Sequence, residues 1–493
     1  MSLKKEISIA AAANWSGVLC GYLLAFIATP IIVHSFGNER YGLWSIAMSI
    51  TGYYGILDIG IRTTVIKYFS QYAETKDYRM SNLLFNTVLA SYIFIIPILL
   101  IIVFILTANV KYIFNISESL IDETKSLLYI ISLNFWMAAA GNLFRSIVAS
   151  LRKFVLQNTI NTVYSILRNI FIIAILKLGY GLIATALVVL FIDLMINITY
   201  IIFVFKYCSY LEIKRKYIQF KEMKHIYVFA FYDLLRHISG IVLGKTDIIL
   251  IGIFLNVRLA AFYSIAESLI RYLAQIPKGL RATLLPFSSK LDAHKEYDSL
   301  KKMALIMPKY TMSFFMLTYL AAILYGQQFL DLWIGPGYEL SYEIMIILIM
   351  VKAISMSQSM LTHIVVGMGD NKFFGIIGFI EMFMNIGLSI FLAKIYGIYG
   401  IALGSLFTVI ITSGILIPVY SIRKLKIKIV EYYLHGIFIP VILCTFLYYF
   451  NSIYLKIESF LWLPLVILEF TILSFIFTWK ELKIKGRKIS FKV

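Results

Sequence analysis

Two basic side chains lie near the middle of long apolar segments, with no acidic residue close enough along the chain to neutralise them. Arg168 and Lys352 have no Asp or Glu three or four positions away. Their partners must come from another helix, from water in a cavity or from a bound anion, because charge at bilayer depth costs at least about 2.5 kcal/mol. Arginine also presents a planar fork that binds oxyanions through two hydrogen bonds. The two residues are therefore candidates for an anion site, with an interhelical salt bridge as the alternative.

Other charged residues in apolar segments have an opposite charge on the same helix face. This spacing of three or four residues joins Asp58 to Arg62, Glu267 to Arg271, and Asp233 to both Arg236 and His237. Residues at that spacing are neighbours on a helix surface. Each pair can be neutralised within its own helix, or its basic member (Arg236 and Arg271 among them) can contact a bound anion.

Acidic residues at bilayer depth suggest a second role. Asp193 and Glu381 are central in their segments and have no basic residue three or four positions away. They can pair with Arg168 or Lys352, or carry a proton in ion-coupled exchange. Asp58 is a further candidate for ion coupling.

The elements that must position these residues are membrane helices. The chain has 493 residues, of which 60% are hydrophobic and 14% charged, with a mean hydropathy of +0.85. Apolar runs of about 20 residues, the length a helix needs to cross hydrocarbon, recur along the whole sequence. We therefore expect an all-α polytopic membrane protein with about fourteen spans. The expected spans are 8–34, 41–70, 81–107, 120–147, 155–176, 180–205, 224–254, 258–287, 304–326, 338–366, 372–393, 397–420, 430–450 and 457–479.

The distribution of charge sets the expected orientation. The net charge of +19 does not indicate nucleic-acid binding, because the basic residues cluster in short loops at alternate helix ends, as the positive-inside rule produces. Both termini, including the basic tail after residue 480, are expected in the cytoplasm. The apolar run after Lys4 and Lys5 is too long for a signal peptide and is expected to be the first span.

Neither a metal nor a cofactor is expected. The three cysteines, Cys20, Cys208 and Cys444, lie far apart and form no metal-ligand spacing. The loops on the outer side are short, which argues against an enzyme with a domain there.

An internal repeat divides the spans into two groups. Three tripeptides recur at an offset of 219 residues: SIA at 45 and 264, GIR at 60 and GLR at 279, KDY at 76 and KEY at 295. The offset joins the second span to the eighth, so that the two halves insert with the same orientation, an arrangement that suits alternating access. We expect an N-terminal lobe at 1–206, a C-terminal lobe at 207–425, and two appended helices with the tail at 426–493. Arg62 and Arg281 occupy equivalent positions and either snorkel to headgroups or form a cationic cytoplasmic mouth.

Four sequence motifs resemble one family of membrane proteins. They are FGNERYGLW at 36–44, LDIGI at 57–61, DIILIG at 247–252 and AFYSIA at 261–266. These segments resemble bacterial polysaccharide flippases, which carry O-antigen or capsule repeat units and belong to the multidrug/oligosaccharidyl-lipid/polysaccharide exporter superfamily. The resemblance covers the first twelve expected spans.

The resemblance implies a function, partners and a location. It implies flipping of undecaprenyl-pyrophosphate-linked oligosaccharide from the cytoplasmic to the outer leaflet of the bacterial inner membrane, for O-antigen, capsule or lipopolysaccharide synthesis. The expected partners are that lipid-linked oligosaccharide, membrane lipids, and the polysaccharide polymerase and chain-length machinery. A pyrophosphate bound between the lobes would satisfy both Arg168 and Lys352.

Three alternatives stay open at this level. Cation-coupled multidrug efflux on the same fold would need carboxylates for its substrate, and the first span has none. A flippase for another lipid-linked cell-wall precursor would use a similar cationic cavity. A membrane-embedded glycosyl- or acyltransferase would need a reactive His or carboxylate constellation, and the sequence does not contain a recognisable one.

Overall fold

The computed structural model describes residues 3–221, 224 and 244–451 of the chain. Within those ranges, the side chains at 3–16, 18–19, 54–60, 95–100, 282 and 435 are not described. The described chain forms two compact units, Met1–Ser264 and Ile265–Val493, and all its regular elements are helical. The repeat predicts a division after residue 206 instead, and that lobe division stays a prediction.

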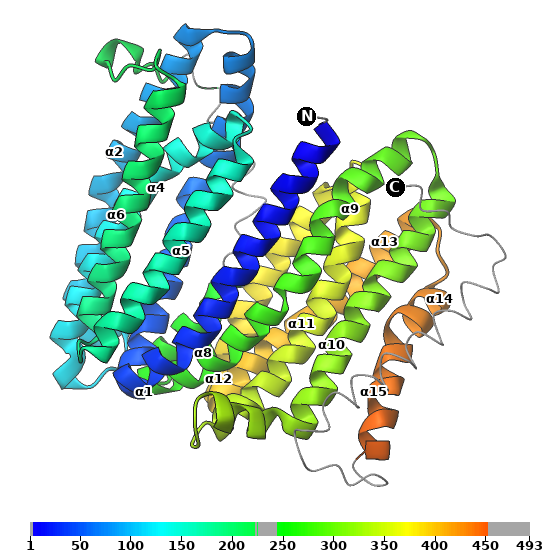
Figure 1. The fold of residues 1–493 in the computed structure, drawn as a ribbon. Coiled ribbons are helices and arrows are strands. Elements are labelled where there is room, and N and C mark those ends of the chain that lie inside the picture. Colours follow the sequence, from blue (N-terminus) through cyan, green and yellow to red (C-terminus); the bar gives the residue numbers. More distant parts are fainter. Residues whose placement is uncertain (1–2, 222–223, 225–243, 452–493) are drawn as a thin grey trace. The chain divides into compact units, whose positions relative to one another are not determined.

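The first unit is a bundle of long helices. Helix α4 packs against α1, α2 and α6, while α5 packs against α1 and α6; α2, α4, α5 and α6 run side by side in Figure 1. Two short helices, α3 and η1, connect α2 to α4. The bounds are α1 Leu3–Glu74, α2 Tyr78–Ala108, α3 Val110–Ile113, η1 Glu118–Leu120, α4 Ile121–Ser150, α5 Phe154–Lys177, α6 Leu182–Tyr207 and η2 Arg215–Tyr217.

Helix α1 contains two of the expected spans. Its regular geometry is interrupted at Gly37, where φ is 68° and ψ is 171°. A side chain at a positive φ is strained, and glycine avoids this cost because it has no Cβ. The kink lies between the expected spans 8–34 and 41–70, so the sequence placed the bend correctly.

The second unit is built around α10 and α11. Helix α11 packs against α9, α10 and α12, and α10 also packs against α15. Phe315, Leu320 and Ala353 are fully buried in one of its cores and Leu361 and Ile364 in another. The bounds are α8 Val257–Leu273 (which carries the chain from one unit to the other), α9 Gln275–Ala293, α10 Tyr297–Trp333, α11 Glu339–Gly367, α12 Lys372–Ile411, η3 Thr412–Leu416, α13 Ile417–Leu425, α14 Ile429–Tyr433, η4 Leu434–Phe438 and α15 Ile439–Tyr449.

One expected span is wrong as a single helix. The segment 258–287 is interrupted at Ala274, so that α8 ends at Leu273 and α9 begins at Gln275. Pro277 lies in the first turn of α9. Proline has no backbone N–H, and in a first turn this loss costs no helical hydrogen bond, because the N–H groups there lack helical partners. Apolarity alone does not reveal this break.

The repeat is visible in the backbone. Helix α1 ends at Glu74 and α9 at Ala293, while α2 begins at Tyr78 and α10 at Tyr297; both pairs are 219 residues apart. In each turn a lysine, Lys76 or Lys295, has a φ of 57°. The residue that follows each lysine donates its N–H to a carbonyl five residues earlier, at 2.9 Å in both cases. The two turns therefore have the same conformation.

Eight helical segments in the described part of the chain are long and apolar enough to span a membrane. Helix α12, which is kinked at Gly397, begins the longest of them, Lys372–Leu425, where two spans are expected. The last expected span, 457–479, and most of 224–254 lie outside the described residues. The chain is an all-α polytopic membrane protein, and the eight segments agree with an arrangement of about fourteen spans.

Candidate functional site: two basic clusters inside the helical units

Basic and polar side chains from four helices gather in the first unit, all of them half-buried except Arg62, which is exposed. We call this group the first basic cluster and define it by Arg62 of α1, Arg145 of α4, Arg168 of α5 and Asp193 of α6. Arg145 is half-buried, and the charges of Arg62, Arg168 and Asp193 all act on it. Four helices thus bring ionisable groups to one place in the apolar bundle.

Arg168 is paired with an acid from the next helix. Its guanidinium forms a salt bridge with the Asp193 carboxylate, and the side chain remains 38% exposed. The second carboxylate oxygen of Asp193 accepts a hydrogen bond of 2.9 Å from the Asn134 amide. The sequence left open whether Asp193 partners Arg168, and the structure places the two together. The salt bridge leaves part of the Arg168 fork accessible to a further ligand.

Arg145 is held by polar and aromatic contacts and has no salt bridge among the described residues. Its terminal nitrogen donates to Asn197 Oδ1 at 2.9 Å, and its guanidinium lies 5.5 Å from the centre of the Tyr200 ring. The Asn197 amide in turn donates to the Met137 carbonyl at 3.0 Å. These contacts orient the guanidinium but do not neutralise it.

The first basic cluster has positive charge to spare and unsatisfied donors. Among the described side chains, three arginines against one aspartate leave two positive charges. The Nε–H groups of Arg145 and Arg168 are buried and have no hydrogen-bond partner among the described residues. Buried donors are nearly always satisfied in folded proteins, so each exception needs an explanation. These Nε atoms are covered by protein, so an oxyanion that balances the excess charge would be held by the other N–H groups of the two guanidinium groups.

Arg145 was missed at the sequence level, although the signal was present. It lies in the expected span 120–147 and has no acidic residue three or four positions away, which is the criterion that singled out Arg168. It is also close to the end of that span, where snorkelling to the interface is the ordinary expectation.

A second group of basic residues lies within the second unit. This second basic cluster is centred on Lys278 of α9, on which the charges of Lys352, Arg281, Arg271 and Glu267 act. Glu267 lies 3.8 Å from Arg271, as the four-residue spacing predicts. Lys278 was not singled out from the sequence, although it lies inside the expected span 258–287 and has no acidic residue three or four positions away.

Lys352 and Glu381 belong to this second group. Both are half-buried, and the charge of Lys352 acts on Glu381. Among the described residues no carboxylate lies within salt-bridge distance of Lys352. The sequence left open whether Lys352 and Glu381 form an ion pair. In the structure their charges interact over a distance longer than a salt bridge.

Several predicted site residues are not tested. The Arg236 segment and the Asp58 side chain lie outside the described residues, so the Asp58–Arg62 pair stays a prediction. Arg168 and Lys352 belong to different units, and their joint contact with one anion also stays a prediction. Arg62 contributes to the first cluster and Arg281 to the second, so each unit contains one of the repeat-equivalent arginines.

An aspartate outside the membrane spans connects the turn between α11 and α12 to a neighbouring helix. Asp370, between α11 and α12, accepts hydrogen bonds from the Tyr420 hydroxyl at 2.7 Å and from Lys424 at 2.9 Å. The Tyr420 hydrogen bond, followed by that of Lys424, lowers the pKa of Asp370. Its role is to fasten the turn to α13.

Neither unit contains a metal-ligand cluster in its described part: no three His, Cys, Asp or Glu side chains there gather as ligands would. What the two units contain is a set of helices that carry positive charge into an apolar bundle. This combination defines a polytopic membrane protein with internal sites suited to anions.

Comparison with known proteins then gives the family. Residues 11–292 match the polysaccharide biosynthesis protein family (Polysacc_synt). This is more than half of the chain, and the chain belongs to that family. The family resemblance drawn from the four sequence motifs is thereby confirmed.

Individual relatives are distant but cover most of the chain. The uncharacterized membrane protein EpsK of Bacillus subtilis (strain 168) is 19% identical over 85% of this chain and 83% of its own length. A Shigella flexneri protein named as an O-antigen transporter is 22% identical over 83% of this chain and 96% of its own.

Solved structures share the fold. The lipid II flippase MurJ, in an inward closed conformation, matches with a TM-score of 0.72 and 16% identity, covering 97% of this chain and all of MurJ (100%). The MATE multidrug transporter DinF-BH, solved in a ligand complex, matches with a TM-score of 0.62 and 15% identity, over 86% of this chain and 96% of its own. At these identities the likeness extends to the fold alone.

Proposed function

We propose that the protein flips an undecaprenyl-pyrophosphate-linked oligosaccharide from the cytoplasmic to the outer leaflet of the bacterial inner membrane, for O-antigen- or capsule-type polysaccharide synthesis. The observation that carries the proposal is the first basic cluster, which has two positive charges in excess among the described side chains, with Arg168 partly exposed. A diphosphate is a dense, multiply charged oxyanion, and arginine forks match its geometry.

The charge pattern supports this cargo over a cationic drug. A cationic substrate would be repelled by both basic clusters, whereas a pyrophosphate would be attracted into an apolar bundle that otherwise excludes it. The names of the relatives do not identify which sugars the transported oligosaccharide contains. In this proposal the protein is a transporter and not an enzyme, since transport requires no bond to be made or broken.

The transport cycle follows from the repeat. The lobes 1–206 and 207–425 rock about a central site in alternating access, both termini stay in the cytoplasm, and helices from 426 onward are appended. Arg168 and Arg145 from one lobe and Lys352 from the other contact the same pyrophosphate. Arg236 and Arg271 are further contacts, and Arg62 and Arg281 form the cytoplasmic mouth. Asp58, Asp193 or Glu381 couples the cycle to an ion. The polymerase and chain-length machinery receive the product.

A genetic experiment tests the proposal. The gene is deleted in its host, and surface polysaccharide and lipid-linked repeat units are measured with and without complementation. We expect polysaccharide to be lost and lipid-linked units to accumulate on the cytoplasmic side. Arg168→Ala, Lys352→Ala and Arg145→Gln should fail to restore polysaccharide at normal expression.

Lys177→Gln serves as the matched control, because Lys177 is an exposed cation at the end of the same helix as Arg168. It should restore polysaccharide fully. If the glycan persists in the deletion strain and sensitivity to cationic drugs rises, the efflux alternative is correct. If another cell-wall polymer is lost instead, the protein serves a different lipid-linked precursor.

A further inference from the structure

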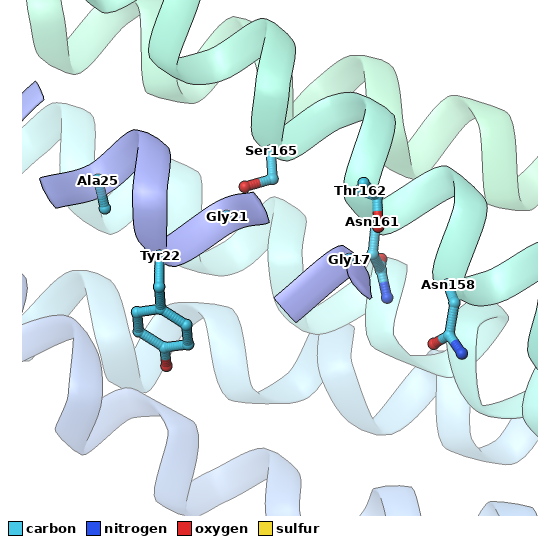
Figure 2. A pocket seen from close by; sticks show the side chains of 8 residues that line it. All are labelled: Gly17, Gly21, Tyr22, Ala25, Asn158, Asn161, Thr162 and Ser165. Atoms are coloured by element: carbon cyan, nitrogen blue, oxygen red, sulfur yellow. The ribbon is translucent and has the colours of Figure 1, made fainter. Parts of the chain in front are cut away.

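A cavity of about 330 Å³ lies between α1 and α5 in the first unit, outside the basic cluster. Gly17, Gly21, Tyr22 and Ala25 form the α1 wall, and Asn158, Asn161, Thr162 and Ser165 form the α5 wall. Figure 2 shows Ser165 directed towards the Gly21 backbone and Thr162 beside Gly17. The volume is at the low end of the range of about 300–1,000 Å³ for small-molecule pockets, which suits a single ring better than a chain of sugars.

The two walls have different chemistry. On α1 the small residues Gly17, Gly21 and Ala25 recur every four positions, so Tyr22 is the only large side chain among the α1 residues that line the cavity. A Cβ on Gly17 would lie 2.1 Å from Thr162 Oγ1, and one on Gly21 would lie 3.2 Å from Ser165 Oγ. The glycines therefore let α1 approach the polar wall. A closely packed helix seam would explain such glycines alone, but not an open cavity beside them.

The α5 wall is polar and uncharged. Its four residues offer two carboxamides and two hydroxyls, groups that can both donate and accept hydrogen bonds. A sugar ring presents hydroxyls, and often an acetamido group, that need partners of both kinds. A charged ligand would find no countercharge among the lining residues. The chemistry of this wall matches a neutral sugar.

The position of the cavity relates it to the first basic cluster. The four α5 residues and Arg168 share one helix face, because Arg168 follows Ser165 by three residues and Asn161 by seven. Three residues correspond to about 4.5 Å along a helix axis. On the other side, the Tyr200 hydroxyl donates to Asn161 Oδ1 at 2.9 Å, and the Tyr200 ring lies under the Arg145 guanidinium. The cavity is thus one residue layer away from both arginines.

From this arrangement we infer that the α1–α5 cavity is a sugar subsite, which binds the neutral ring attached directly to the diphosphate while Arg145 and Arg168 hold the diphosphate. The inference rests on the proposed function. It adds a recognition element: the hydroxyl and amide groups of α5 form hydrogen bonds with the first sugar of the lipid-linked substrate. A lipid diphosphate without sugar would occupy the basic cluster and leave the cavity unused.

Binding to the purified full-length protein in nanodiscs tests this subsite. The probes are farnesyl diphosphate and the same lipid diphosphate carrying one N-acetylglucosamine, with affinity read by native mass spectrometry. Two net hydrogen bonds to the ring correspond to about a tenfold tighter affinity for the glycosylated probe. Thr162→Val keeps the shape of the side chain but removes its hydroxyl, so the preference should fall to about threefold.

A second variant fills the cavity, and a third is the control. Ala25→Leu places an apolar side chain in the space between the helices and should abolish the preference while the affinity for bare diphosphate stays unchanged. Thr159→Val makes the same chemical change as Thr162→Val on the same helix, at an exposed position outside the lining. It should leave the preference at the wild-type value.

The outcomes separate the subsite from the proposed function. If the wild type binds both probes equally, or if Thr162→Val and Ala25→Leu weaken both probes to the same extent, the subsite is wrong and the diphosphate site stands. Equal effects of Thr159→Val and Thr162→Val would also overturn the subsite. If neither probe binds, the proposed function fails and the subsite falls with it.

Discussion

Replacing Asp193 by Asn removes the negative charge of the first basic cluster with little change of shape. In the wild type, one carboxylate oxygen accepts from Arg168 and the other accepts from the Asn134 amide at 2.9 Å. The Asn134 Oδ1 atom is buried and has no hydrogen-bond partner among the described residues. If the Asn134 amide turns over, that oxygen can accept from the new amide at position 193. The hydrogen bonds are then kept, so the variant should fold and melt close to the wild type.

The charge change has a calculable effect on anion affinity. An anion on the far side of the Arg168 guanidinium would lie about 7 Å from Asp193, and two unit charges at that distance interact with about 2.4 kcal/mol at an effective dielectric constant of about 20. Arg168 is 38% exposed, so solvent screens part of this repulsion. We expect a net gain of about 1–2 kcal/mol, or about five- to thirtyfold tighter binding.

The assay measures farnesyl diphosphate binding and thermal unfolding of the same samples. Asn134→Asp is the opposite control, because it adds a negative charge beside Asp193 with the same side-chain size, and it should weaken binding. If Asp193→Asn is stable but binds no more tightly than wild type, the anion does not bind at Arg168 and the reasoning fails. If binding tightens but transport stops, Asp193 carries the coupling proton, because an amide cannot be protonated in this range.

Three further predictions concern other parts of the described structure. Arg145→Gln keeps an amide that can donate to Asn197 but loses the charge, so diphosphate affinity should fall by about ten- to a hundredfold, the effect of one charge-assisted hydrogen bond; Arg145→Lys, which keeps the charge without the fork, should lie between, and an unchanged affinity in a folded glutamine variant contradicts the site. Gly42→Ala should lower the free energy of unfolding by about 1–3 kcal/mol, because its Cβ would lie 1.9 Å from the Val257 carbonyl oxygen; a melting temperature equal to wild type would show that the backbone there yields easily. Asp370→Asn should destabilise the turn before α12 by up to about 1 kcal/mol at neutral pH. Because the pKa of Asp370 is lowered in the folded protein, its contribution is present at neutral pH and is lost as the pH falls below the ordinary carboxyl pKa and through that lowered value. Wild type and variant should therefore have converging melting temperatures in acid, and a constant difference from pH 7 to pH 3 would exclude the ion pair as its cause.

The internal repeat shows what local sequence patterns can predict at a distance. The tripeptides KDY and KEY predicted equivalent positions, and the structure has the same turn at both, with Lys76 and Lys295 at a φ of 57°. Turn conformation depends on a few neighbouring residues and their backbone hydrogen bonds, so similar segments fold alike in both units. The kink at Gly37 lies in the gap between the apolar runs 8–34 and 41–70, which were expected as separate spans.

The interruption at Ala274 shows a limit of hydropathy. The segment 258–287 is apolar enough to be read as one span, and hydropathy averages over about 19 residues. A single proline, Pro277, changes the hydrogen-bonding of one turn without changing that average. The position of Pro277 favoured two helices and the apolarity of the segment favoured one. The sequence alone did not show which of the two the chain forms.

The amino-acid sequence by itself determined that this is an all-α membrane protein, which family it belongs to, and which central charges need partners from elsewhere. Those properties follow from apolar run length, motif spacing and the cost of charge in hydrocarbon. Only the tertiary structure decided who the partners are. Arg168 meets Asp193 of the next helix, Arg145 joins them from α4, and a cavity opens beside them between α1 and α5. The rotation of each helix about its axis decides such contacts, and it is set by packing across the whole bundle rather than by the residues of any one span.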